Sequence, residues 1–270
     1  MPRAVTVTYS VWPQPDQVAH AAAQLFTDVA VAAAQARGAA RIAISGGSTP
    51  KRMFALLADP LQPFLAQIPW EKLWLYWVDE RCVPPDHSES NYRMTREAML
   101  DNVPLPQSQV FRMEGEPEPE AAANRYETFL RNSMRLEGAE LPTFDLVLLG
   151  MGDDGHTASL FPHTDAINEL GRLVVANHVP QKDTWRITLT WPVINQGREV
   201  VFLIEGAAKA DVLAEVLTGP RDPERLPSQL IRPATGRLRL LLDQAAAAKL
   251  PPASQPTDGA GTVGTLELGS

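Results

Sequence analysis

A glycine-rich segment carries the side chain in this sequence that is best suited to proton transfer. The segment reads GMGDDGHTASLFP, spans residues 150–162 and follows a run of apolar residues. Its His156 comes two residues after Asp154. Imidazole exchanges protons near neutral pH, and a nearby carboxylate can hold the ring in one tautomer and raise its basicity. We therefore expect His156 to transfer protons, with Asp154 as a candidate partner.

Two other interpretations of this histidine stay open. Asp153, Asp154 and His156 could bind a metal, with His163 as a further ligand. Against this, the segment lacks a recognised ligand spacing, and no cysteine lies in it. Alternatively, the histidine could simply cap a turn.

The segment SGGSTP, residues 45–50, could bind an anion. Gly46 and Gly47 would let the backbone approach a ligand closely, while Ser48, Thr49 and the amides at the start of the following helix could donate to a phosphate. The same residues could equally make a turn and cap the helix.

Charged side chains stand at three further places. Asp79 and Arg81 belong to VDER, which follows an aromatic-rich run. Unpaired charges are costly to bury, so these residues either form an ion-pair network or face a polar ligand. Arg186 begins RITLT and Lys209 lies in GAAKA. Both suit phosphate binding, although single cations of this kind are commonly solvated charges.

Alternating strands and helices must position these residues. Apolar runs predict strands at residues 1–9, 41–45, 73–79, 144–149, 173–176, 186–189, 200–204 and 238–242. Helical patterns lie between them, at residues 16–36, 50–57, 91–100, 118–136 and 208–217. This alternation predicts a doubly wound, mostly parallel α/β sheet, which binds ligands beyond the carboxyl ends of its strands.

Composition is typical of one globular domain. The 270 residues are 44% hydrophobic and 21% charged, and 24 basic against 32 acidic residues give a net charge of −8. We expect a single domain over residues 1–250 and a poorly ordered, flexible tail over residues 251–270, where aromatic and charged residues are few. The acidic balance argues against a nucleic-acid or anionic-membrane surface.

Several further classes of protein are disfavoured. The single cysteine, Cys82, excludes an internal disulfide. No apolar run is long enough for a membrane span and the first residues do not read as a signal peptide, so we expect a soluble, cytoplasmic protein. No nucleophile elbow, Walker A loop or dinucleotide fingerprint is present, and hence no cofactor is implied.

Taken in order, the motifs GGSTP, VDER followed by SNYRM, GMGDDGHTASLFP and RITLT resemble the 6-phosphogluconolactonase family. This resemblance implies a Rossmann-like sheet shared with glucosamine-6-phosphate deaminases. It also implies metal-independent hydrolysis of 6-phosphoglucono-δ-lactone, a small-molecule substrate of the pentose phosphate pathway. By the same resemblance, His156 is the general base and Arg81 lies near the lactone, while the phosphate is held by Ser48, Arg186 and Lys209.

Two other functions are compatible with the same motifs. Similar deaminases carry Asn-Glu-Pro where this chain has Ser159-Leu160-Phe161-Pro162, so a carboxylate of their ring-opening chemistry is missing, although Asp79 matches their base position. A non-catalytic sugar-phosphate sensor is the third possibility, but no helix-turn-helix segment or basic face accompanies the motifs. The group that would stabilise an oxyanion is left open between Arg81 and backbone amides of the glycine-rich loops.

Overall fold

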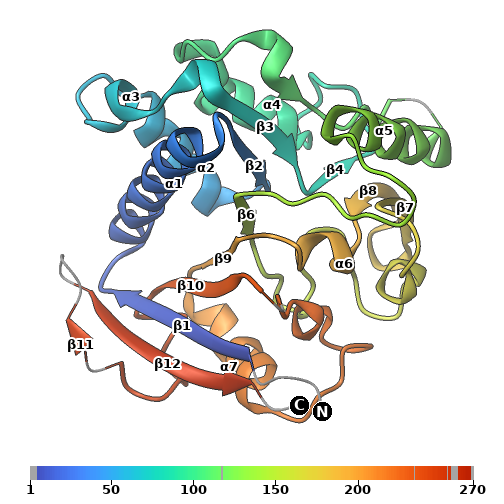
Figure 1. Ribbon diagram of the computed structural model, residues 1–270. Coiled ribbons are helices and arrows are strands. Elements are labelled where there is room, and N and C mark those ends of the chain that lie inside the picture. Colours follow the sequence, from blue (N-terminus) through green and yellow to red (C-terminus); the bar gives the residue numbers. More distant parts are fainter. Residues whose placement is uncertain (1–4, 117, 234, 254, 257–260, 269–270) are drawn as a thin grey trace.

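A nine-stranded sheet runs through the centre of the molecule (Figure 1). The computed structural model describes residues 5–116, 118–233, 235–253, 255–256 and 261–268. The strand order is β11-β12-β1-β10-β9-β6-β2-β3-β5. Within this order, every pair of neighbouring strands between β1 and the edge strand β5 is parallel. The strands are β1 (Val5–Trp12), β2 (Ala40–Ile44), β3 (Leu73–Trp77), β5 (Val110–Phe111), β6 (Leu146–Leu149), β9 (Glu199–Ile204), β10 (Arg237–Asp243), β11 (Gln255–Pro256) and β12 (Thr262–Leu268). This confirms the predicted α/β class with a large, mostly parallel sheet.

Seven α-helices accompany the strands in the part of the chain that the structure describes. They are α1 (Pro15–Arg37), α2 (Ser48–Ala58), α3 (Phe64–Gln67), α4 (Asn91–Ala98), α5 (Pro119–Met134), α6 (Trp191–Ile194) and α7 (Ala210–Thr218). The longest, α1, buries Val18, Ala22 and Phe26, whose helical spacing places them on one face. It ends at Gly38, which takes the left-handed conformation and donates its N–H to the carbonyl of Ala34.

A second, antiparallel sheet of three strands stands beside the large one. Its order is β4-β8-β7, with β4 at Asp79–Arg81, β7 at Val174–Val179 and β8 at Thr184–Leu189. The strands predicted near residues 173–176 and 186–189 therefore exist, but assigning them to the doubly wound sheet was wrong. A short turn, Pro180–Lys182, joins β7 to β8, so the two must pair as a hairpin, whereas parallel strands need a long crossover.

The predicted flexible tail is wrong for Thr262–Leu268. These residues form β12, which pairs antiparallel with β1 from Val5–Leu268 to Val11–Thr262. A side chain at Gly264 would clash with the ring of Tyr9, so the close approach of this strand requires glycine. The edge of β1 offers unpaired backbone groups that a composition argument does not take into account. Of the other tail residues, 254, 257–260 and 269–270 lie outside the described residues.

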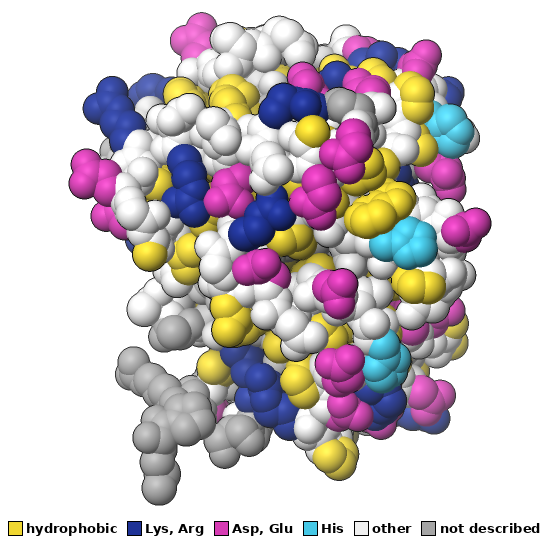
Figure 2. All heavy atoms as spheres, turned by 90° about the vertical axis from the view of Figure 1, so that its right-hand side faces the viewer, with side chains coloured by type: hydrophobic (Ala, Val, Ile, Leu, Met, Phe, Trp, Pro, Cys, Tyr) yellow, Lys and Arg dark blue, Asp and Glu magenta, His cyan; other side chains and the backbone are white. Residues whose placement is uncertain are grey.

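Acidic and basic side chains are interspersed on the face of the molecule that Figure 2 shows. On that face the basic side chains do not gather into one patch, which agrees with the acidic net charge of the chain. Among the described residues, no helix combines the length and the apolar character that a membrane span requires.

Candidate active site

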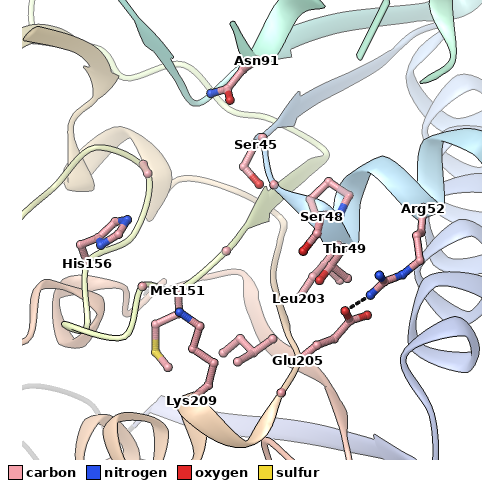
Figure 3. Close-up of a pocket in the computed structure, with 18 of the residues that line it drawn as sticks. Ser45, Ser48, Thr49, Arg52, Asn91, Met151, His156, Leu203, Glu205 and Lys209 are labelled. Atoms are coloured by element: carbon pink, nitrogen blue, oxygen red, sulfur yellow. Dashed lines mark hydrogen bonds and ion pairs between the residues drawn. The ribbon is translucent and has the colours of Figure 1, made fainter. Parts of the chain in front are cut away.

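A pocket of about 570 Å³ opens where the carboxyl ends of the central strands meet (Figure 3). Loops that follow β2, β6 and β9 supply most of its wall, together with β4 and the end of β10. Its lining includes Ser45, Gly46, Gly47, Ser48, Thr49, Arg52, Asp79, Arg81, Asn91, Gly150, Met151, Gly152, His156, Ala158, Glu205, Gly206, Lys209 and Asp243. The site thus lies at the edge of the sheet where parallel α/β proteins bind ligands.

His156, on the wall of this pocket, pairs with Asp154, which lies outside the pocket lining. The Nδ1 atom of His156 lies 2.5 Å from Oδ1 of Asp154, and the backbone N–H of His156 donates to the same oxygen at 3.1 Å. Burial opposes ionisation of Asp154, but the hydrogen bonds and charge of His156 prevail and lower the pKa of Asp154 to about 2. An ionised Asp154 accepts from Nδ1–H, so Nε2 is the ring nitrogen that carries the lone pair.

The glycine-rich loop packs tightly around this imidazole. A Cβ at Gly152 would clash with His156, so the loop tolerates no side chain there. The ring of Phe161 stacks on the imidazole of His156, with the two ring centroids 4.0 Å apart and the ring planes 20° apart. Ala158 takes the left-handed conformation, with φ of 49°, and redirects the chain between the two aromatic rings. The imidazole is thereby held between a carboxylate and an apolar ring.

The anion-binding segment predicted from SGGSTP lies on another wall of the pocket. Gly47, with φ of 117°, precedes α2, and Ser48 and Thr49 form the first turn of that helix. The backbone amides of this turn have no partner within the helix and are suited to an anionic group. Lys209, which begins the turn into α7, reaches the same pocket (Figure 3).

The last three residues of VDER, Asp79–Arg81, form strand β4, in which alternate residues face opposite ways. Asp79 and Arg81 line the pocket. Glu80 points away and caps α4, accepting hydrogen bonds from the backbone amides of Asn91 at 2.7 Å and Tyr92 at 2.8 Å. Burial raises the pKa of Glu80 in spite of these bonds. Of the carboxylates of Asp79 and Glu80, only that of Asp79 therefore faces the pocket.

Arg186 does not line the pocket, in contrast to Arg81, its neighbour across the β4–β8 pair. It is buried, with 8% of its surface exposed. Burial and the adjacent guanidinium of Arg81 lower the pKa of Arg186. Of the residues expected to hold a phosphate, the structure brings residues 46–49 and Lys209 into the lining of one pocket, and it places Arg186 directly opposite Arg81 on the same face of the small sheet.

Four pocket residues with charged or amide side chains were not identified from the sequence. Arg52 and Glu205 form an ion pair on the far side from His156 (Figure 3). Asp243 accepts from the backbone N–H of Gly206 at 3.0 Å and fixes the loop that carries Lys209. Asn91 follows the capping Ser90 in SNYRM. Glu205 and Asp243 lie at or beside the carboxyl ends of β9 and β10, a position that could have identified them.

The suggested metal ligands are not assembled in the structure. Within the ranges that the structure describes, no three His, Cys, Asp or Glu side chains lie close enough to share an ion. Nδ1 of His163 instead lies 3.4 Å from a carboxylate oxygen of Glu224.

Comparison with known proteins adds three findings. The model of the glucosamine-6-phosphate isomerases/6-phosphogluconolactonase family matches residues 13–240. A protein of Synechocystis sp. named 6-phosphogluconolactonase is 43% identical over 217 residues, which are 80% of this chain and 87% of the relative. The structure of 6-phosphogluconolactonase from Trypanosoma cruzi is similar with a TM-score of 0.79 and 30% identity, over 93% of this chain and 97% of that one.

A monomeric glucosamine-6-phosphate deaminase shares the fold as well. Its TM-score is 0.73 over 90% of this chain and 99% of that chain, but the identity is only 19%. Since the same fold carries both names, the choice between the two chemistries depends on the residues of the pocket.

Proposed function

The chain belongs to the glucosamine-6-phosphate isomerases/6-phosphogluconolactonase family, and we propose that it hydrolyses 6-phospho-D-glucono-1,5-lactone to 6-phospho-D-gluconate in the pentose phosphate pathway. It is an enzyme of the 6-phosphogluconolactonase type, by its likeness to relatives of that name over most of its length. The observation that carries the proposed reaction is the 2.5 Å contact between His156 and Asp154 on the wall of a pocket that also holds an anion-binding helix start and Lys209. We propose further that the enzyme works in the cytoplasm without a cofactor.

In the proposed reaction, Nε2 of His156 removes a proton from water as the water oxygen attacks the lactone carbonyl. Ionised Asp154 stabilises the imidazolium that forms and holds the ring in the required tautomer. The tetrahedral oxyanion then collapses, the bond from carbon to the ring oxygen breaks, and the imidazolium returns its proton to that oxygen. Arg81 is the proposed donor to the oxyanion, because it is a pocket cation on the strand that also carries Asp79.

In this proposal, binding of the phosphate group orients the lactone for reaction. We assign it to the amides and hydroxyls of Ser48 and Thr49 and to the ammonium of Lys209, which line one pocket. Arg186, which lies opposite Arg81 on the same face of the small sheet, adds positive charge for the phosphate in this proposal. Gly46 and Gly47 allow the backbone to approach the ligand.

Deamination of an amino-sugar phosphate is the main competing chemistry, because Asp79 lines the pocket and could abstract a proton. It also needs an acid group to manage ring opening. Where similar deaminases carry that carboxylate, this chain has Leu160 and Phe161, which are 0% and 2% exposed, and the ring of Phe161 stacks on the imidazole. An apolar ring at this place favours the lactonase.

Parallel assays test the proposal. One preparation is assayed for opening of 6-phosphogluconolactone above the uncatalysed rate and for release of ammonia from glucosamine 6-phosphate. We expect lactone opening only, and a loss of roughly 10²–10⁴-fold in the folded His156→Ala variant, because a positioned base contributes that much. Ammonia release at catalytic rates without lactone opening would overturn the proposal.

A further inference from the structure

A buried hydrogen bond joins the loop of the proposed base to the small sheet. The hydroxyl of Ser159 donates to Oδ2 of Asp79 at 2.7 Å. Ser159 is 1% exposed and Asp79 is 6% exposed, so water competes little for this bond. Ser159 lies three residues after His156, and Asp79 opens β4. The bond therefore ties a pocket carboxylate to the segment that carries the imidazole.

Ser159 is itself held in one orientation. Its backbone N–H donates to Oγ1 of Thr188 at 3.3 Å, and its carbonyl accepts from the side-chain amide of Asn177 at 2.9 Å. The left-handed turn at Ala158 directs His156 to the pocket and leaves Ser159 facing β4. Because both backbone groups of Ser159 are engaged, its hydroxyl is a fixed donor.

Asn91 holds Asp79 from a second side. Its side-chain amide donates to the carbonyl of Asp79 at 3.0 Å and approaches Oδ1 at 3.4 Å. Gly46 leaves room for this amide, because a Cβ there would clash with it. The hydroxyl of Ser159 and the side-chain amide of Asn91, which approach the carboxylate of Asp79, are both uncharged, so neither pairs it with a cation, and Asp79 lines the pocket.

We propose that Ser159 is a positioning residue, whose hydroxyl fixes the carboxylate of Asp79 so that Oδ1 accepts a hydrogen bond from a ring hydroxyl of the sugar lactone. This inference rests on the proposed function. An acceptor that is already in place costs no ordering when the substrate binds. Because the same loop carries His156, the bond also sets how the hydroxylated ring lies relative to the base.

A double-mutant cycle tests this with Ser159→Ala and Asp79→Ala, which removes both acceptor oxygens. If Ser159 acts through Asp79, Ser159→Ala raises KM for the lactone about 10-fold, the size expected for one hydrogen bond to a charged group, with kcat changed less than about twofold. In the Asp79→Ala background, Ser159→Ala then has no further effect on KM. Effects on KM that multiply in the double variant would overturn the positioning role.

Controls separate this role from a general loss of stability. Thr190→Val also removes a buried hydroxyl, which donates to the carbonyl of Arg172 at 2.8 Å and does not touch Asp79, so KM should stay unchanged. A rise in KM for Thr190→Val equal to that for Ser159→Ala would contradict a specific role. If Ser159→Ala does not fold, Ser159→Cys takes its place in the cycle, because a thiol of similar size is only a weak donor.

Failure of the proposed function gives a different result. It would appear as a wild-type protein that opens no lactone. The cycle is then run on the affinity for 6-phosphogluconate, measured by calorimetry. Non-additive losses of that affinity would support the coupling of Ser159 and Asp79, and additive losses would overturn it.

Discussion

The imidazole of His156 is held by two neighbours, the carboxylate of Asp154 and the apolar ring of Phe161. Asp154 determines which ring nitrogen holds the proton, while Phe161 limits rotation of the ring. The imidazole side chain is 23% exposed, so it can still be reached from the pocket. At the scale of single residues, this arrangement supports the proposed proton transfer through Nε2.

Asp154→Asn should lower kcat/KM about 100-fold or more, because an amide no longer stabilises the imidazolium or selects its tautomer. Since the pKa of Asp154 is lowered to about 2, its carboxylate is ionised at every pH used for assay. The loss should hence be present in full at pH 7, where the Asp154 carboxylate is ionised, and steady-state kinetics of both enzymes at that pH measure it. Equal kcat/KM of wild type and variant would contradict a role of Asp154 in the proton transfer.

The same shift has a consequence for stability. The folded-state pKa of Asp154 lies below its ordinary value near 4, so the ionised contact with His156 stabilises the protein above about pH 4, and this is lost as the pH falls toward about 2. In thermal melts, the difference between wild type and Asp154→Asn should shrink only below about pH 4.

Lys209→Ala should raise KM for the phosphorylated lactone about 10-fold or more and leave that for unphosphorylated gluconolactone nearly unchanged, because its ammonium is assigned to the phosphate. Lys182→Ala, which removes an exposed cation on the turn between β7 and β8, is the matched control for net charge. Equal losses on both lactones would remove Lys209 from the phosphate site.

Helix α4 and the loop before α2 depend on each other. Carboxylate oxygens of Glu80 accept the first backbone amides of α4, which places Asn91 in the space that Gly46 leaves open. Since the side-chain amide of Asn91 also donates to the carbonyl of Asp79, this packing joins the segment of residues 45–50 to β4. The contact between elements therefore requires glycine at position 46 for steric reasons.

Gly46→Ala should lower the free energy of unfolding by about 1–3 kcal/mol, the usual cost of forcing an atom into a packed site. Gly150→Ala is the matched control, because a Cβ there meets no atom within 4 Å and should cost much less. Chemical denaturation of both variants measures the difference. Equal stability of the two would mean that Asn91 moves aside at little cost.

The whole molecule closes its large sheet with a strand from its far end. β12 covers the edge of β1, and Leu268 is 5% exposed in the core. The pocket lies at the carboxyl ends of β2, β6 and β9, and β12 contributes none of its lining residues. The contacts of β12 therefore stabilise the sheet without forming part of the pocket.

Removing residues 254–270 should lower Tm by about 5 °C or more, because the apolar contacts and the backbone pairing of β12 are lost. In a protein of this size, a loss of 1 kcal/mol in the free energy of unfolding lowers Tm by about 2–4 °C. The newly exposed edge of β1 should also promote aggregation. Well below Tm, kcat/KM should remain within about twofold of wild type. An unchanged Tm in a scanning calorimeter would show that β12 contributes little.

The sequence by itself determined the chemistry-bearing loops and most of the elements. Period and turn signals located the long helix that ends at Gly38 and the buried parallel strands, because burial on both faces produces continuous apolar runs. His156, Asp154, Lys209 and residues 46–49 were predicted as site residues because their short-range context already carries the signal. All of them line the pocket except Asp154, which contacts the imidazole from behind.

Only the tertiary structure decided which segments meet. Periodicity does not distinguish a hairpin in a small sheet from strands of a large one, so β7, β8 and with them Arg186 were misplaced. The contacts of Ser159 with Asp79 and of Gly46 with Asn91 join residues distant in the chain. β12 forms because β1 presents an open edge, although its own composition resembles a disordered tail. Such pairings depend on complementary shape and unpaired groups in three dimensions, which no local window of residues contains.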